Sequence, residues 1–216
     1  MSKRAVIVGW AHTRFGKLDD PDVETLIAQV ARGALDHAQV GPGEVDAITV
    51  GVYNNGLTPQ GFEGALVALG EPALRFTPAV HVENACATGT AALYRAMDFI
   101  ESGRGRIALA VGAEKMTAVP PREVAEALLS GCYRKEEENP YGFAGIFANI
   151  AQTYFDRYGD RREELAMIAS KNHGNGVHNP YAHVQKAFDV AFCNTVSDKN
   201  PIVAGPLRRT DCSMVS

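Results

Sequence analysis

The chain has 216 residues, of which 46% are hydrophobic and 21% charged, and its formal net charge is −4. This size and balance indicate a globular protein made of one large domain, or of a domain that carries an insertion. They argue against nucleic-acid binding, because no basic run is present, and against a membrane span, because the longest apolar runs are strand-sized.

The first part of the chain predicts strands that alternate with helices. An apolar run at Ala5–Gly9 indicates a strand buried on both faces of a sheet. Asp20–Pro21 has the form of a helix cap with proline at the first helical position, and apolar residues then recur at helical spacing as far as Ala38. A second strand is expected at 46–52 and a softer helix around 62–69. This alternation favours a largely parallel sheet.

The next stretch, from His81 to Met97, reads as a strand end, a turn and a helix, with Cys86 in the turn. Backbone N–H groups and the helix dipole favour negative charge at a helix start, so this position predicts a lowered pKa and a reactive thiolate at Cys86. The alternative is an inert buried cysteine, since free cysteines are among the most buried residues. The apolar positions expected on the helix, which Ser102–Gly103 ends, are Ala91, Leu93, Ala96, Met97 and Ile100.

A loop-rich insertion is predicted after a strand at 107–111 and a change of character near Thr117. Within it, Ile146–Phe155 indicates an amphipathic helix whose aromatic stripe predicts core packing. Asp160–Glu163 has the form of a capping box and predicts another helix. The Asn-, Gly-, His- and Pro-rich run at 171–183 predicts a loop. Its histidines, His173, His178 and His183, lack the spacing of metal ligands, so no metal site is expected there.

The cysteines lie far apart along the sequence. No pair has CxxC spacing among Cys86, Cys132, Cys193 and Cys212. This argues against a zinc site and against a dithiol redox pair. The N-terminus also lacks a signal-peptide core, so scattered free thiols predict a reducing compartment and a cytoplasmic protein.

Three segments of the chain resemble motifs of the thiolase superfamily, and the first two occur in the same order as in that family. Asn-Ala-Cys-Ala-Thr-Gly at 84–89 resembles the nucleophile turn of these proteins. The strand at 107–112, which runs into Ala-Glu-Lys-Met at 113–116, is similar to the segment that follows the nucleophile helix. The run at 171–183 resembles the loop region of thiolases of the sterol-carrier-protein-2 type. The likeness covers essentially the whole chain.

The resemblance implies an α/β protein with the thiolase-like βαβαβαββ layered fold. Its sheet would be mixed and mostly parallel, with helices on both faces and an inserted loop domain. Residues 1–117 and 205–216 would form the core of the first thiolase half, incomplete at its last strand, and 118–204 the loop domain. The C-terminal half of the family fold would be absent.

The resemblance also implies an acyl-CoA acyltransferase of the thiolase type. Such an enzyme performs Claisen condensation, or thiolytic cleavage of a 3-ketoacyl-CoA, through an acyl-cysteine, here at Cys86. Its substrates are coenzyme A thioesters, no cofactor is permanently bound, and it assembles as a homodimer or homotetramer. The family's catalytic histidine, oxyanion hole and second acid/base group belong to the half whose motifs this sequence lacks. We therefore expect little or no turnover unless a second chain completes the fold.

Two other interpretations stay open. One is a non-catalytic thiolase-like subunit, or a binding module in a lipid-transfer or aldolase complex. The other is a condensing enzyme of the ketoacyl-synthase kind, which shares the fold and the nucleophile. The sequence does not indicate which residues contact coenzyme A.

Overall fold

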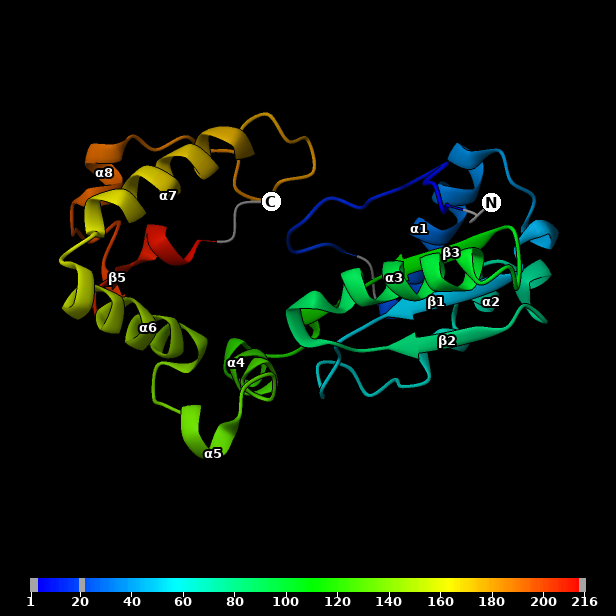
Figure 1. Cartoon of the computed structure of the whole chain (residues 1–216), viewed down its shortest axis with the longest axis horizontal. Coiled ribbons are helices and arrows are strands. Elements are labelled where there is room, and N and C mark those ends of the chain that lie inside the picture. Colours follow the sequence, from blue (N-terminus) through cyan, green and yellow to red (C-terminus); the bar gives the residue numbers. More distant parts are fainter. Residues whose placement is uncertain (1–3, 20–21, 214–216) are drawn as a thin grey trace. The chain divides into compact units, whose positions relative to one another are not determined.

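The computed structural model describes residues 4–19 and 22–213, and the chain divides into two compact units (Figure 1). Among the described residues, the first unit contains 4–13, 19 and 22–127, and the second contains 14–18 and 128–213. The boundary thus follows Ala127, later than the predicted change at residue 117.

Three parallel strands form the sheet of the first unit, in the order β2-β1-β3. The strands are β1 (Ala47–Gly51), β2 (Ala79–Val82) and β3 (Ala108–Gly112). In this register Val50 of β1 pairs with His81 of β2. The strands predicted at 46–52 and 107–111, the strand end predicted near His81, and the parallel sheet are therefore confirmed.

One face of this sheet carries the main apolar core of the unit. It packs against α1 (Val23–Ala38) and α2 (Val67–Gly70), and side chains two residues apart on β1 point to the same face. Burial of these apolar side chains is the main contribution to the stability of the layer. The buried members are Val23, Ile27, Ala31, Leu35, Val45, Ile48, Val50, Val52, Leu66, Val67, Leu74, Leu109 and Val111.

The opposite face is covered by α3 (Thr88–Glu101), so helices lie on both faces, as predicted. The buried positions of α3 are Thr88, Ala92 and Ala96. Leu93, which was predicted to be on the buried face, is 38% exposed. The α3 layer approaches the sheet closely at Gly51, and small side chains at the contact permit that approach.

The strand predicted at Ala5–Gly9 is absent from the described part of the chain, and this prediction is wrong. The segment is extended but unpaired, and Val6 and Ile7 are 76% and 75% exposed. The Ala5 N–H donates to a carboxylate oxygen of Glu101 at 3.2 Å. An apolar run becomes a strand only where a neighbouring strand accepts and donates its backbone hydrogen bonds.

Helix starts and short turns complete the first unit. The side chain of Asp22 caps α1 by accepting a hydrogen bond from the Thr25 N–H at 2.8 Å. The predicted cap Asp20–Pro21 lies outside the described residues. The helix predicted at 62–69 is divided into a 3₁₀ turn and the short α2. The 3₁₀ turns of the unit are η1 (Pro42–Glu44), η2 (Glu63–Ala65), η3 (Pro72–Leu74), η4 (Ala85–Ala87) and η5 (Met116–Ala118).

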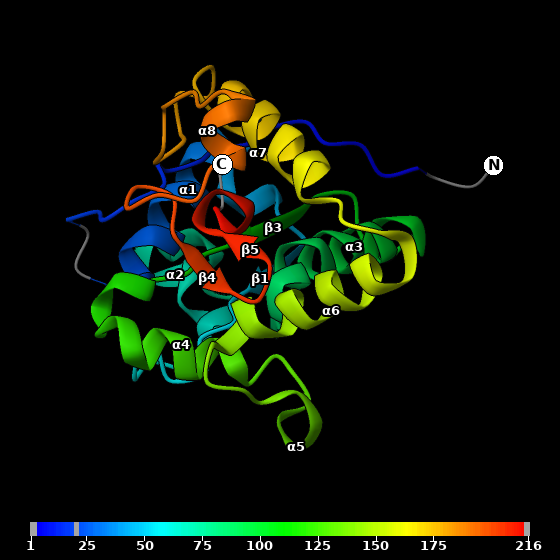
Figure 2. The same ribbon diagram turned by 90° about the vertical axis from the view of Figure 1, so that its left-hand side faces the viewer.

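The second unit contains helices and a two-stranded antiparallel sheet. Its strands lie beside α6 (Gly142–Tyr158), as Figure 2 shows. Ala148, Ala204 and Leu207 are buried together at this contact. Residues 205–213 therefore lie in this unit. The prediction had placed 205–216 with the core that contains the three-stranded sheet. The helix α4 (Pro121–Leu129) connects the units. The further elements are α5 (Arg134–Glu137), α6 (Gly142–Tyr158), α7 (Arg162–Gly176), α8 (Val190–Asn194), β4 (Ile202–Ala204), β5 (Leu207–Arg208) and η6 (Arg209–Cys212).

Two predictions for this unit need correction. The aromatic stripe of α6 is not core: Phe147, Ile150 and Tyr154 are more than half exposed, and smaller residues such as Ala148 face inward. The run at 171–183 is not all loop, because α7 continues to Gly176. No described helix has both the length and the apolar character needed to cross a membrane.

Candidate nucleophile site at the end of the parallel sheet

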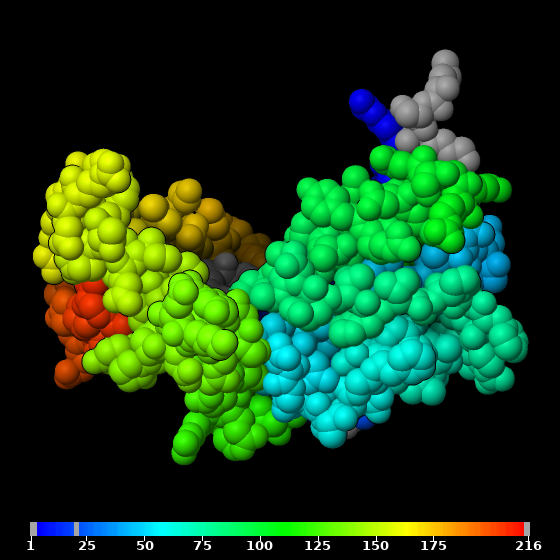
Figure 3. Space-filling view, turned by 60° about the horizontal axis from the view of Figure 1, so that its bottom comes forward, coloured from blue at the N-terminus to red at the C-terminus, as the bar shows by residue number. Residues whose placement is uncertain are grey.

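Cys86 is an exposed free thiol in η4, between the end of β2 and the start of α3. The segment that contains β2 and α3, teal to green in Figure 3, reaches the surface of its unit. Within the described residues no side chain caps α3 at Ala87. Backbone N–H groups at an uncapped helix start attract negative charge. An exposed thiol at such a position has the setting of a nucleophilic cysteine.

The turn before Cys86 contains a backbone conformation that residues other than glycine rarely adopt. Ala85 has a φ of 45°, in the left-handed region that favours glycine. The Thr88 hydroxyl accepts a hydrogen bond from the Asn84 N–H at 2.8 Å and donates to the Ala85 carbonyl at 2.7 Å. The Ala85 N–H also donates to the Glu83 carboxylate. Side chains on both sides of Cys86 therefore fix the turn.

The turn is also supported from below by the sheet. Thr88 is buried and packs directly on Gly51, the last residue of β1. A Cβ atom at Gly51 would lie 3.0 Å from both the Cγ2 atom and the carbonyl oxygen of Thr88, so a side chain there would be tightly packed. Thr88 thus connects the nucleophile turn to the carboxyl end of β1, the edge of a parallel sheet at which ligands usually bind.

A buried carboxylate lies at the same edge of the sheet. The side chain of Glu63, in η2, is 3% exposed. Asn54 Nδ2 donates a hydrogen bond to Glu63 Oε1 at 3.0 Å, and His81 Nδ1 lies 3.5 Å from Glu63 Oε2. The other ring nitrogen of His81 lies 2.7 Å from the Val52 carbonyl oxygen. Glu63 and His81 thereby connect η2, β2 and the chain that follows β1.

A second carboxylate, Glu114, follows β3. It accepts hydrogen bonds from the backbone N–H groups of Tyr53 at 2.9 Å and Asn54 at 3.1 Å. Burial raises the pKa of the Glu114 carboxyl group, and the negative charge of Glu63 adds to that effect. The two backbone hydrogen bonds and the charge of His81 act in the opposite direction. We call Asn54, Glu63, His81 and Glu114 the strand-end network.

The strand-end network was not among the features predicted from the sequence. Its members are scattered between residues 54 and 114, so no local motif contains them. A topological signal was available, because Asn54, His81 and Glu114 each lie at or just after the carboxyl end of a parallel strand. In a parallel sheet these ends meet at one edge.

The other thiols have different surroundings. Cys193 is buried, and burial raises the pKa of its thiol. Cys212 is an exposed residue, but partial burial of its thiol and the negative charge of Asp211 raise the pKa of that thiol. Cys132 is half-buried, and its thiol donates to the Leu129 carbonyl. A raised thiol pKa leaves less thiolate at neutral pH, so Cys193 and Cys212 are poorer nucleophile candidates.

The histidines of 171–183 do not form a site with one another. His173 is buried in α7 with its ring centroid 4.8 Å from that of Phe188, in an edge-on arrangement. Burial lowers the pKa of His173. His178 is exposed, and the ring of His183 lies against Gly16. Across residues 4–19 and 22–213, no group of three His, Cys, Asp or Glu side chains is placed to hold a metal.

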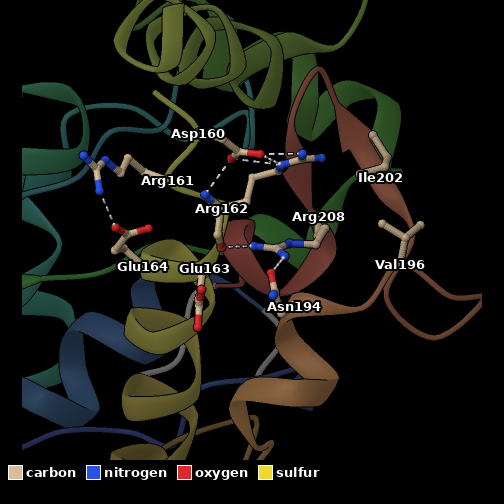
Figure 4. Close-up of a pocket in the computed structure, with 9 residues that line it drawn as sticks. All are labelled: Asp160, Arg161, Arg162, Glu163, Glu164, Asn194, Val196, Ile202 and Arg208. Atoms are coloured by element: carbon tan, nitrogen blue, oxygen red, sulfur yellow. Dashed lines mark hydrogen bonds and ion pairs between the residues drawn. The ribbon is translucent and has the colours of Figure 1, made fainter. Parts of the chain in front are cut away.

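A polar hollow of about 600 Å³ lies in the second unit (Figure 4). Two of its arginines are paired with carboxylates: Arg162 with Asp160, and Arg161 with Glu164. Arg208, at the back of the hollow, donates to Asn194 and to the Arg162 carbonyl, both at 2.6 Å. The arginines therefore do not converge on the empty space, and the hollow is a weaker candidate site than Cys86. The residues around it are Asp160, Arg161, Arg162, Glu163, Glu164, Asn194, Val196, Ile202 and Arg208.

Comparison with known proteins agrees with the family that the sequence motifs resemble. The family model described as "Thiolase, N-terminal domain" matches residues 5–194. The acetyl-CoA acetyltransferase of Methanothermobacter thermautotrophicus is 33% identical over 211 residues, 97% of this chain and 54% of that protein. Sterol carrier protein 2 of Bos taurus is 29% identical over 200 residues, 88% of this chain and 36% of that protein.

A solved structure has a similar fold. The crystal structure of the Bacillus anthracis acetyl-CoA acetyltransferase matches 81% of this chain and 47% of its own with a TM-score of 0.60, at 20% sequence identity. The chain thus spans about half the length of the acetyl-CoA acetyltransferases that it matches.

Proposed function

Because the chain belongs to the thiolase family through its N-terminal domain, we propose that it supplies the acyl-accepting half of an acyl-CoA acyltransferase, with Cys86 as the nucleophile. The observation that carries this proposal is the exposed Cys86 thiol in the turn between β2 and α3, within the family's motif. The other described cysteines lack that setting, because Cys193 and Cys212 have raised thiol pKa values and Cys132 lies outside any strand–turn–helix segment.

In this function, the sulfur of Cys86 attacks the thioester carbonyl carbon of an acyl-CoA. A carbon–sulfur bond to Cys86 forms as the carbon–sulfur bond to coenzyme A breaks. The electron pair leaves with the coenzyme A sulfur, which takes up the proton that Cys86 gave away. Backbone N–H groups at the start of α3 would add to the oxyanion hole that the resemblance assigns to the other thiolase half. The acyl-cysteine divides one difficult transfer into two easier steps.

The acyl group would then pass to the carbanion of a second acyl-CoA, which gives a 3-ketoacyl-CoA, or the reverse reaction would cleave a 3-ketoacyl-CoA with coenzyme A. That step needs a base for the acceptor carbon. We propose that the base comes from outside the described units, from a further polypeptide segment or a second chain. No permanently bound cofactor is required, because the thioesters are the substrates.

We also propose a cytoplasmic protein that assembles as a homodimer or homotetramer. Its free cysteines are typical of a reducing compartment. Exposed apolar side chains support assembly, because large apolar patches on a surface usually mark contacts with other proteins. They include Val6, Ile7, Val8, Trp10, Phe147, Ile150 and Tyr154.

A second candidate function is a binding module without catalysis. The similarity to sterol carrier protein 2 and to the Caenorhabditis elegans non-specific lipid-transfer protein-like 2, 31% identical over 201 residues, favours it. The exposed aromatic face of α6 would then contact a partner or an apolar ligand. This module would bind an acyl-CoA and leave Cys86 unmodified.

The test is the intact mass of the chain after incubation with acetyl-CoA. We expect a gain of one acetyl group in the wild-type protein and in Cys212→Ser, and none in Cys86→Ser. Cys212→Ser is the matched control because Cys212 is also an exposed free cysteine. Acetylation that persists in Cys86→Ser would contradict the assigned nucleophile. Calorimetric binding of acetyl-CoA without any mass gain would favour the binding module.

A further inference from the structure

One stretch of backbone, 51–54, supports both the nucleophile turn and the strand-end network. Gly51 packs on Thr88, whose hydroxyl holds the turn before Cys86. The residues that follow serve the network: the Val52 carbonyl contacts His81, and the N–H groups of 53 and 54 donate to Glu114. The same short stretch of backbone therefore contacts both the turn and the network.

The hydrogen bonds of His81 define where a proton lies. A carbonyl oxygen only accepts, so the His81 Nε2 atom, 2.7 Å from the Val52 oxygen, carries hydrogen. The Nδ1 atom then faces Glu63 Oε2 at 3.5 Å. An Nδ1 lone pair beside a carboxylate would be repulsive. A second proton is therefore held on Nδ1 or on Oε2, shared by His81 and Glu63.

The proton shared by Glu63 and His81 lies in a partly buried cluster of charged groups, where its charge affects the neighbouring carboxylates. The Glu63 side chain is 3% exposed, so water screens its charge poorly. The charges of Glu63 and His81 both act on Glu114. The charged groups that face one another here are Glu63 from η2, His81 from β2 and Glu114 after β3. The charge of Lys115, next in the chain, acts on Asp22.

We propose that Glu63, His81 and Glu114 are positioning residues for Cys86, and that the proton shared by Glu63 and His81 holds segment 51–54, and through it the nucleophile turn, in its reactive geometry. This inference rests on the proposed role of Cys86 and deepens it. Loss of the shared proton at higher pH leaves two carboxylates without an opposing charge. Segment 51–54 then loosens and negative charge increases beside the turn, so Cys86 reacts more slowly than titration of its thiol alone predicts.

The test is the rate at which iodoacetamide alkylates Cys86 in the full chain, from about pH 5 to pH 9, a range that spans ordinary histidine titration. The test variant is Glu63→Gln. Its amide oxygen can still accept from Asn54, and its amide N–H can donate to His81 Nδ1, which removes the shared proton and keeps the shape. Glu123→Gln, at an exposed position of α4, is the matched control.

For the wild type and for Glu123→Gln, we expect the plot of alkylation rate against pH to show a second inflection besides that of the thiol. The rate should change by about threefold across it, the size expected when neighbouring residues are energetically coupled. The Glu63→Gln profile should lack it. A wild-type profile with a single inflection would overturn the proposal, as would a Glu63→Gln profile that coincides with the wild type.

Nuclear magnetic resonance of the His81 ring in the wild-type chain gives an independent readout that needs no variant. We expect hydrogen on Nε2, the atom that faces the Val52 carbonyl oxygen, at every pH at which the chain is folded. A neutral ring with hydrogen on Nδ1 alone would overturn the proposal. Because alkylation needs no acyl-CoA, the two hypotheses fail separately. If acetylation of Cys86 fails but the profile depends on Glu63, only the proposed function is wrong. If acetylation of Cys86 succeeds and Glu63→Gln leaves the alkylation profile unchanged, only the proposed role of the strand-end network is wrong.

Discussion

Gly51, the last residue of β1, lies directly against Thr88, the first residue of α3. A Cβ atom at Gly51 would come within 3.0 Å of both the Cγ2 atom and the carbonyl oxygen of Thr88, and within 3.3 Å of the Ala92 Cβ. The carbonyl is backbone and cannot turn away as a flexible side chain could. The glycine therefore determines how closely α3, and the Cys86 turn before it, sit on the sheet.

Gly51→Ala is expected to lower the free energy of unfolding by about 1–3 kcal/mol, because it overpacks this contact. It should also slow the alkylation of Cys86, since the turn must shift with Thr88. Chemical denaturation and iodoacetamide labelling measure the two effects. Gly43→Ala is the control, because a Cβ there meets nothing within 4 Å. Unchanged stability and labelling in Gly51→Ala would show that the contact does not position the turn.

The thiols should differ in reactivity when the folded chain is treated with iodoacetamide at neutral pH. Cys86 should be modified first, because it is exposed at a helix start. Cys193 and Cys212 should follow slowly, because burial raises the pKa of each thiol and the charge of Asp211 adds to this at Cys212. Peptide mass spectrometry over time measures the order. In denaturant the differences should disappear. Faster modification of Cys212 than of Cys86 in the folded chain would contradict this assignment.

Glu114 should make the stability of the first unit depend on pH. Burial raises the pKa of Glu114 above its ordinary value of 4.5, so the folded chain binds this proton more tightly than the unfolded chain. The stabilisation is fully present below pH 4.5 and is lost as pH rises through the raised pKa. Glu114→Gln should flatten that part of the unfolding-versus-pH curve, and Glu123→Gln should not. This prediction is contradicted if the free energy of unfolding of the wild type rises steadily with pH above 4.5 and Glu114→Gln leaves that rise unchanged.

In the second unit, the buried ion pair of Arg208 and Asp211 should dominate the effects of charge removal. Their side chains are each 2% exposed, and Arg208 Nε lies 2.8 Å from Asp211 Oδ2. Asp211→Ala leaves the guanidinium buried without its counter-charge, so we expect a loss of about 3–5 kcal/mol in unfolding experiments. Glu138→Ala breaks the exposed Arg134–Glu138 pair and should cost at most about 1 kcal/mol. Equal losses in the two variants would contradict this difference in burial.

The sequence predicts the parts of the fold that are encoded locally. β2, the Cys86 turn, α3 and β3 each lie in a short stretch of sequence that has its own apolar positions or end signal, and all are present. The setting of Cys86 follows from the same local pattern. These elements need little information from the rest of the chain.

The parts that could not be predicted depend on distant partners. Ala5–Gly9 has the composition of a buried strand but no pairing strand in the described residues, so it stays extended and exposed. Phe147 and Tyr154 have core-like spacing, yet small residues of α6 make the buried contact. The strand-end network depends on strand order, which periodicity along one chain does not contain.

The most direct measurement of the central claim is a peptide map of the folded chain after treatment with acetyl-CoA, followed by addition of free coenzyme A. We expect one acetyl group on the peptide that contains Cys86, and its removal when coenzyme A is added, because the thioester exchange is reversible. An acetyl group found on other residues, or bound acetyl-CoA with an unmodified Cys86 peptide, would contradict the assignment of Cys86 as the acyl-accepting nucleophile.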